Sequence, residues 1–232
     1  MGYESIDPMM ERVKLVAGFV VGGTAGNVDT VFKLEESYRG SVAMKSCVER
    51  MKADPEMGAR IAEGYVSPQY DLEALIAYPP GSLAHTYARL LQSQGLQPHF
   101  YPDLPLDDDE SYVIMRMRKT HDLHHVVTGF SMKSAGEAGV IAVAAYQFGY
   151  PAFMLIDLAG MAASFKFGVG LQHAIDHVEN GFAIGRAAKP LAGIKWEAGW
   201  EKPVARWREE LGIVPVTNGE HSWYDAVPQM YA

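Results

Sequence analysis

Apolar residues recur at helical spacing along most of this chain, whereas the alternating pattern typical of strands is scarce. The segment that follows Ser82 is an example, because its apolar residues form one stripe of a helix and Gly95 would end it. The same reasoning predicts helices over 8–20, 27–36, 39–53, 55–64, 82–95, 109–128, 152–167, 169–183 and 203–211, a further helix that begins at Ser134, and a short element over 71–77. No change in composition marks a domain boundary, so residues 1–232 are predicted to form one all-α domain with an irregular tail after Ile213.

Two helix boundaries carry recognisable capping patterns. Asp107 with Glu110 resembles a capping box at the start of the helix over 109–128, and Gly129 would end that helix. Ser134 with Glu137 resembles a second capping box. These patterns predict two consecutive helices joined by a short turn.

The longest uncharged stretch spans the nineteen residues 138–156. This length approaches the roughly 20 apolar residues of a membrane-spanning helix. Gly149 and Pro151 interrupt the stretch, and proline breaks a helix interior. The stretch is therefore interpreted as two core helices that meet near these residues.

Composition narrows the class of protein. The chain has 232 residues, 48% of them hydrophobic, which is ordinary for a globular domain. Its formal net charge of -8 argues against a nucleic-acid partner, because such proteins usually carry a basic excess. The one cysteine, Cys47, excludes an intrachain disulfide and a cysteine-based zinc cluster. The first residues show neither an apolar signal core nor transit-peptide character, so we expect a cytoplasmic protein of bacterial type.

The segment HDLHH and the glutamate that follows it suggest a metal site. His121 and His125 are four residues apart, so both lie on one face of the predicted helix. Asp122 lies on the same arc, and Glu137 is separated from His125 by eleven residues, enough to turn and start the next helix. Two nitrogen and two oxygen ligands suit zinc, iron or manganese. Alternatively, the histidines are ordinary core or surface residues, Asp122 is a surface charge and Glu137 only caps its helix.

Two further groups of residues carry candidate chemistry. Arg118 precedes His121 by three residues on the same arc, so it either binds a substrate carboxylate or pairs with a neighbouring acid. His173 and His177, with Asp176 between them, resemble a helical metalloprotease pattern with aspartate in place of glutamate. Because no third ligand is obvious there, a polar helix face is the preferred interpretation.

The residues quoted above resemble a known family. The stretch from His121 to Glu137 matches the H-D-x-x-H-x11-E motif of the ubiquinone (coenzyme Q) biosynthesis family Coq4. RMRKTHDLHHVVTG, PPGSLAHTYARLLQSQGLQP and GRAAKPLAGIKWEAGWEKPVARWREELGI are also similar to segments of that family. The resemblance covers roughly residues 27–213.

The resemblance implies an all-helical homodimer that binds a divalent metal, most often Zn²⁺, with Fe²⁺ or Mn²⁺ as alternatives. In this sequence the ligands would be His121, Asp122, His125 and Glu137. The implied activity is C1 decarboxylation, with or without oxidation, of a polyprenylated hydroxybenzoate at the inner membrane, within a quinone-biosynthesis complex. The alternative is a non-catalytic scaffold that binds prenyl lipids. Small residues over 138–167 would then line a channel for the prenyl tail, or else simply allow tight helix packing.

Overall fold

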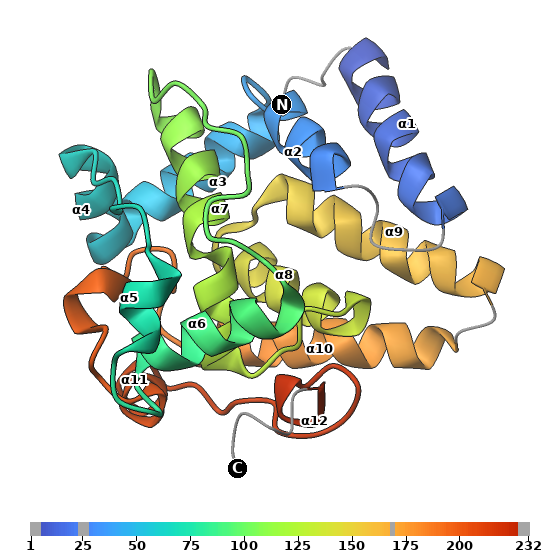
Figure 1. Ribbon diagram of the computed structural model, residues 1–232. Helices are drawn as coiled ribbons and strands as arrows, with labels where there is room; N and C mark the ends of the chain where they lie inside the picture. Colours follow the sequence, from blue (N-terminus) through green and yellow to red (C-terminus); the bar gives the residue numbers. More distant parts are fainter. Residues whose placement is uncertain (1–5, 23–27, 168–169, 227–232) are drawn as a thin grey trace.

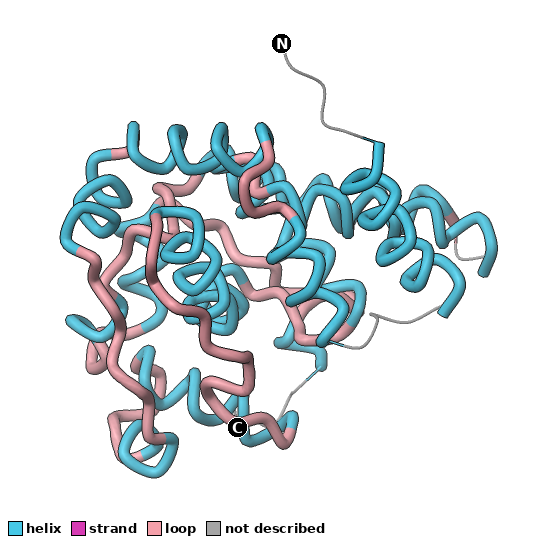
Figure 2. The backbone as a smooth tube through the Cα atoms, turned by 90° about the horizontal axis from the view of Figure 1, so that it is seen from above, coloured by secondary structure: helices cyan, strands magenta, loops and turns pink. Residues whose placement is uncertain are grey.

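The described part of the chain is almost entirely helical, as predicted. The computed structural model describes residues 6–22, 28–167 and 170–226 (Figure 1). Within these ranges it contains no strand, only isolated bridges between Ser82 and Pro203 and between Phe130 and Ser222. The view from above shows the same all-helical arrangement in one compact domain (Figure 2). The all-α prediction is confirmed.

The helix boundaries agree closely with the predictions. The elements are α1 (Ile6–Gly22), α2 (Val28–Ser37), α3 (Val42–Ala53), α4 (Pro55–Glu63), α5 (Leu72–Ile76), α6 (Leu83–Gln94), α7 (Asp109–Thr128), α8 (Ser134–Phe148), α9 (Pro151–Phe167), α10 (Leu171–Ala187), the 3₁₀ helix η1 (Trp196–Gly199), α11 (Val204–Leu211) and α12 (Trp223–Ala226). Only η1 and α12 had no counterpart in the sequence-based prediction.

Helix α7 forms the centre of the molecule. Most of its side chains are buried, and it contacts α3, α4, α6, α8 and α11. Helix α8 packs along α10 and against α9, and α1 lies along α9 (Figure 1). The core therefore surrounds α7 and α8, which are the two helices that carry the predicted metal ligands.

Both predicted capping boxes were wrong in detail. The N-cap of α7 is Asp108, whose side chain accepts the amide hydrogen of Ser111 at 2.7 Å. The Glu110 carboxylate instead accepts a hydrogen bond from the backbone N–H of Gly40, 2.6 Å away. Helix α8 has Lys133 at its N-cap without a side-chain cap, so Glu137 is not engaged in capping.

The uncharged stretch forms two helices that meet near Gly149 and Pro151, as predicted, and α8 is mostly buried, whereas α9 exposes Met154 and Leu158. Helix α8 ends at Phe148 and α9 begins at Pro151, where a proline in the first turn costs no hydrogen bond. Among the described residues, no helix has both the length and the apolar character needed to cross a membrane.

Helices α8 and α10 approach each other closely through two glycines. A Cβ atom at Gly181 would overlap the carbonyl oxygen of Gly139 and would lie 2.6 Å from the Cβ of Ala142. A Cβ at Gly139 would overlap the ring of Phe130, which packs just after the end of α7. Glycine at position 181 thus allows the close contact between α10 and α8, and glycine at position 139 leaves room for the ring of Phe130.

The substitution Gly181→Ala should destabilise the protein by about 1–3 kcal/mol, because the extra methyl group overpacks this contact. Gly160, in α9, is the matched control, since a Cβ there meets nothing within 4 Å. Gly160→Ala should stabilise by about 0.5–1 kcal/mol through its higher helix propensity. Urea unfolding of both variants measures the difference, and equal effects at the two positions would contradict this packing.

Candidate metal centre

The turn between α7 and α8 brings three predicted ligands together. His121 and His125 lie one turn apart on the last half of α7, which ends at Gly129. Gly129 adopts φ +86°, a left-handed conformation that favours glycine, and the chain reverses there into α8. Glu137 lies in the first turn of α8 and faces both histidines.

The three side chains converge on one point. His121 Nε2 lies 3.0 Å from Glu137 Oε2, and His125 Nε2 lies 3.3 Å from Glu137 Oε1. The two Nε2 atoms are 3.1 Å apart. Ligands of a tetrahedral zinc ion at 2.0–2.2 Å are separated from one another by roughly 3.3 to 3.6 Å. The spacing of the donors therefore fits a zinc-sized cation after small movements.

Hydrogen bonding fixes the orientation of the buried histidine. The Nδ1 atom of His125 lies 3.0 Å from the carbonyl oxygen of Phe130, so Nδ1 carries the hydrogen and donates it. The lone pair of His125 Nε2 is therefore directed at His121 Nε2 and the Glu137 carboxylate. Only a proton or a cation at this point can relieve the repulsion between the lone pairs. A backbone carbonyl that orients a ligand histidine in this way is a common feature of metal sites.

Electrostatics keep the glutamate ionised. Burial alone would raise the pKa of Glu137, but the neighbouring His125 and His121 outweigh it and lower this pKa well below its usual range. For His121, burial would lower the pKa, but the attraction of Glu137 outweighs it and raises the pKa. An ionised carboxylate beside two imidazoles is the form that a divalent cation would bind.

Asp122 lies beside these three residues but outside the group. Its carboxylate is not among the ligand atoms that lie within 4.8 Å of one another in the described structure. The residue is buried and faces the adjacent cavity, and burial raises the pKa of its carboxyl group. Its role as a fourth ligand therefore stays a prediction.

Arg118 forms the ion pair that the sequence offered as an alternative to substrate binding. Its guanidinium donates from Nε to Glu35 at 2.8 Å and from Nη2 to Glu36 at 3.0 Å. Nη1 donates to the carbonyl oxygen of Pro102, 2.9 Å away, and the side chain is almost fully buried. The guanidinium already donates to acceptors within the protein. Substrate binding by Arg118 therefore stays a prediction, and it would require Arg118 to break some of these hydrogen bonds.

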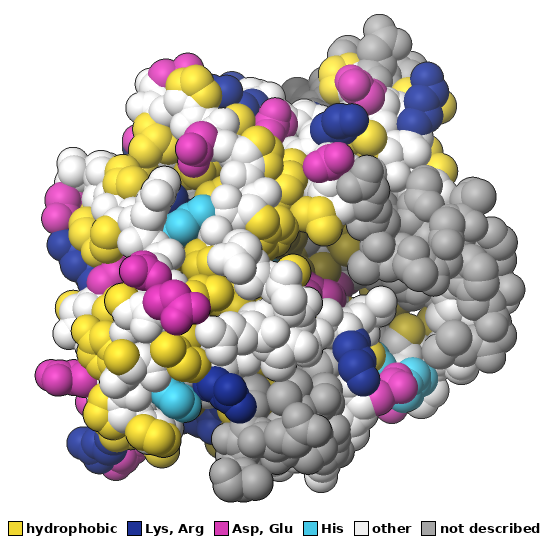
Figure 3. Space-filling view, in the orientation of Figure 1, with side chains coloured by type: hydrophobic (Ala, Val, Ile, Leu, Met, Phe, Trp, Pro, Cys, Tyr) yellow, Lys and Arg dark blue, Asp and Glu magenta, His cyan; other side chains and the backbone are white. Residues whose placement is uncertain are grey.

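A large cavity opens beside the three ligands. Its volume is about 910 Å³, near the upper end of the range for small-molecule sites. Figure 3 shows this face of the molecule hollowed near its centre, where hydrophobic side chains surround an acidic one. The apolar lining includes Val31, Phe32, Leu96, Phe100, Met117, Met132, Ile141, Phe153, Ile156, Ala159, Met161 and Ala163. The stretch over 138–167 thus contributes both to tight helix packing and to the cavity wall.

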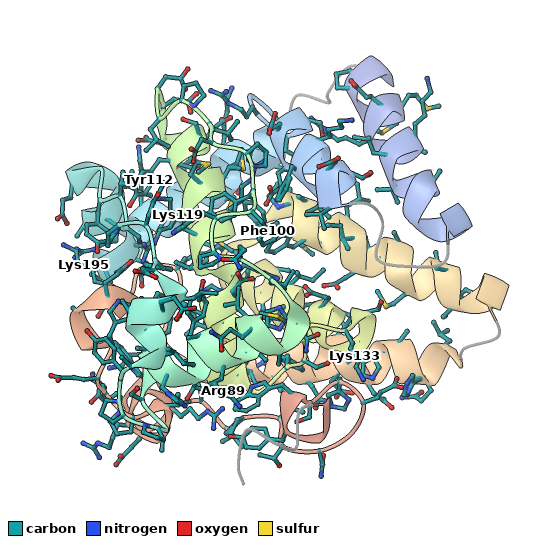
Figure 4. All side chains as sticks on the ribbon, viewed as in Figure 1. Arg89, Phe100, Tyr112, Lys119, Lys133 and Lys195 are labelled. Carbon is teal, nitrogen blue, oxygen red and sulfur yellow. The ribbon has the colours of Figure 1, made fainter. Side chains whose placement is uncertain are left out.

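Lys133 and Asp157 are among the ionisable residues of the cavity wall that sequence reasoning did not single out. Lys133, labelled in Figure 4, is exposed at the start of α8, and no hydrogen bond or ion pair engages its ammonium group among the described residues. Asp157 is buried in α9, and neither carboxylate oxygen has a hydrogen-bond partner within the described structure. One signal was present in the sequence, because Asp157 is the only charged residue between 138 and 165.

The tail after Ile213 is irregular in part, as predicted, but it packs tightly over the turn between α7 and α8. The backbone N–H of Val216 donates to Thr128 at 2.8 Å, and that of Trp223 donates to Gly129 at 3.0 Å. The indole N–H of Trp223 donates to the carbonyl oxygen of His125, 3.1 Å away. The tail therefore holds the end of α7 that carries His125.

Asp157 makes stability depend on pH. Burial raises its pKa to about 8, whereas the pKa of an aspartate in an unfolded chain is about 3.9. The free energy of unfolding is therefore unaffected by this titration below about pH 4, and it falls as the pH rises from about 4 to about 8, because the folded state holds the proton more tightly. The substitution Asp157→Leu, which keeps the number of side-chain heavy atoms, should stabilise by on the order of 2–4 kcal/mol at pH 8 and far less at pH 4.5.

Thermal unfolding across this pH range measures the effect, and the exposed Asp176 provides the control variant Asp176→Asn. Curves for wild type and Asp157→Leu that stay parallel from pH 4.5 to pH 8 would contradict the proposed protonation of Asp157.

Comparison with known proteins places this site within a family. The chain is 33% identical over 187 residues to the ubiquinone biosynthesis protein COQ4 homolog, mitochondrial, of Rattus norvegicus, a match that covers 76% of this chain and 68% of the rat protein. It is 31% identical over 150 residues to the ubiquinone biosynthesis protein COQ4, mitochondrial, of Eremothecium gossypii, covering 63% of this chain but only 46% of that protein. This chain thus spans less than half of the length of the Eremothecium gossypii protein, and an activity of the full-length relative is only a proposal for this chain.

A solved structure shows the same fold. A crystal structure from Nostoc punctiforme, of a protein provisionally assigned to ubiquinone biosynthesis, superimposes with a TM-score of 0.80 at 28% identity. The superposition covers 91% of this chain and 99% of that one. The profile of the family described as coenzyme Q (ubiquinone) biosynthesis protein Coq4 matches residues 9–217. With most of its length matched in this way, the chain belongs to the Coq4 family of ubiquinone biosynthesis proteins.

Proposed function

We propose that this protein is a metal-dependent decarboxylase that removes the C1 carboxylate of a polyprenylated hydroxybenzoate during ubiquinone biosynthesis. The observation that carries the proposal is the convergence of His121, His125 and Glu137 beside a largely apolar cavity of about 910 Å³. Family membership supports the role in ubiquinone biosynthesis. The chemistry of the site supports the reaction.

The cavity has two chemically different parts, which suit an amphipathic substrate. Its walls are mostly apolar side chains, which would accept a prenyl tail. Glu137, His121 and Asp122 lie in the same wall and form a polar region that suits an aromatic ring with hydroxyl and carboxylate groups. Such a ring would lie beside the ligands while the tail fills the apolar space.

The three ligands, with Asp122 as a proposed fourth, would hold a divalent cation, most plausibly Zn²⁺, with Fe²⁺ or Mn²⁺ as alternatives. The bound ion would act as a Lewis acid that stabilises negative charge on substrate oxygens. Phe130 would keep His125 in the required tautomer through its carbonyl oxygen. The apolar walls would exclude water, which strengthens these interactions.

Decarboxylation breaks the bond between C1 and the carboxylate, leaves the electron pair on the ring and requires a proton in its place. Lys133 is suited to bind the carboxylate before this step, because this exposed residue belongs to the cavity wall at the start of α8 and its ammonium group has no ion-pair partner among the described residues. Arg118 is less available, since Glu35 and Glu36 occupy it. We therefore assign the orienting role to Lys133.

The proposal extends to location and partners. The curated relatives are named as mitochondrial proteins. For this chain we propose action at the surface of the inner membrane, on its cytoplasmic side in a bacterium, where a polyprenylated substrate would reside. A homodimer and contacts with other quinone-biosynthesis proteins are part of the same proposal.

The test is release of labelled CO₂ from a carboxyl-labelled, polyprenylated 4-hydroxybenzoate in detergent, with metal restored. Wild type should release CO₂, and His121→Ala should lose at least about 100-fold in rate, as expected for loss of a metal ligand. Lys133→Ala should mainly raise KM, because the carboxylate would lose its counter-ion. His85→Gln is the control, since His85 lies on α6 and bonds to the carbonyl oxygen of Ile76.

One result would replace the proposal with the non-catalytic alternative. If metal-loaded wild type binds the prenylated substrate in the same assay but never releases CO₂, the protein acts as a lipid-binding scaffold. Equal rates in wild type and His121→Ala would instead show that the metal centre takes no part in the reaction.

A further inference from the structure

The structure supplies a third ligand to the histidine pair that the sequence left without one. His173 and His177 lie one turn apart on α10. Glu220 comes from the tail, in the turn just before α12, and its carboxylate contacts both histidines. Because Glu220 is 43 or more residues away along the chain, spacing alone could not reveal this group.

The ligand atoms of the three residues lie close together. His173 Nε2 forms a hydrogen bond with Glu220 Oε1, and His177 Nε2 lies 3.9 Å from the same oxygen. The two imidazole rings are 4.4 Å apart between centroids, and all three ligand atoms lie within 4.8 Å of one another. His177 is buried, whereas His173 and Glu220 are exposed. A buried ligand with two adjustable partners allows the group to close around a cation.

We propose that His173, His177 and Glu220 form a second divalent-metal site, of the zinc class, at the edge of the cavity. Two imidazole nitrogens and one carboxylate oxygen are the protein ligands of many zinc sites that leave a position open. The exposed side of His173 and Glu220 leaves this position to water. His221 lies next to His177, with ring centroids 4.8 Å apart, and is near enough to act as an additional ligand after rotation.

The plain alternative is an ion pair between His173 and Glu220. An exposed pair of this kind contributes little to stability, typically less than about 1 kcal/mol. Such a pair would not involve His177, because its Nε2 atom lies 3.9 Å from the Glu220 carboxylate, beyond hydrogen-bond distance. A shared cation would use all three side chains, and metal binding distinguishes it from the ion pair.

The site would join the tail to α10. The same tail donates hydrogen bonds to the end of α7 from Val216 and Trp223, and the carbonyl oxygen of His221 accepts the backbone N–H of Ser131 at 2.7 Å. A cation on Glu220 would therefore hold the tail over the turn that positions His125 and Glu137. His121 and Glu137 line the same cavity as His173, His177 and Glu220. The match to the family profile ends at residue 217, before Glu220.

Metal binding by the full chain, stripped with a chelator and dialysed against Zn²⁺, tests the proposal. Wild type should hold two equivalents by elemental analysis. Glu220→Gln and His173→Gln, both at exposed positions, should each hold one, with at least 10-fold weaker binding at this site. Glu179→Gln, an exposed glutamate on α10, is the matched control and should hold two. His121→Ala should keep the equivalent that Glu220→Gln removes, so the two sites fail independently.

Amide hydrogen exchange provides a second measurement that does not depend on counting metal. Adding Zn²⁺ to the His121→Ala protein should slow exchange at residues 216–223, and Glu220→Gln in the same background should abolish the slowing. The proposal is overturned if the His121→Ala protein binds no metal, if Glu220→Gln retains the affinity of wild type, or if Zn²⁺ leaves exchange in this segment unchanged.

Discussion

The reversal of the chain at Gly129 determines most of what this molecule can do. It places the first turn of α8 against the last turns of α7, so that Glu137 meets His121 and His125. A Cβ atom at Gly129 would overlap the carbonyl oxygen of Val216, so the tail can close over the turn only because this residue is glycine. The ligand geometry, the tautomer of His125 and the position of the tail thus depend on one backbone conformation.

The cavity beside this turn combines apolar walls with buried ionisable groups. Apolar walls exclude water and suit a lipid, but they also raise the cost of burying charge. The paired groups tolerate this environment, since Glu137 is stabilised by two imidazoles and Arg118 by Glu35 and Glu36. Asp157 has no such partner among the described residues, which is why burial raises its pKa to about 8. Buried ionisable groups that reduce stability are common where a protein binds or transforms a ligand.

Local sequence patterns predicted the helices and the grouping of His121, His125 and Glu137, because both depend on spacing along one helix or across one short turn. The bounds of α7 and the shared face of His121 and His125 are of this kind. Tertiary contacts determined the rest. Nothing near Arg118 in sequence indicated Glu35, 83 residues away, and nothing near His177 indicated Glu220. The N-cap of α7 is Asp108, one residue after the predicted Asp107, because the side chain of Asp108 accepts the amide hydrogen of Ser111.

Anomalous diffraction would show whether His121, His125 and Glu137 share one divalent cation, on which the proposed function depends. Crystals of the protein grown with Zn²⁺ would be measured above and below the zinc absorption edge. We expect an anomalous peak about 2.0–2.2 Å from His121 Nε2, His125 Nε2 and a Glu137 oxygen. A zinc-loaded crystal with no anomalous density between these three side chains would contradict it.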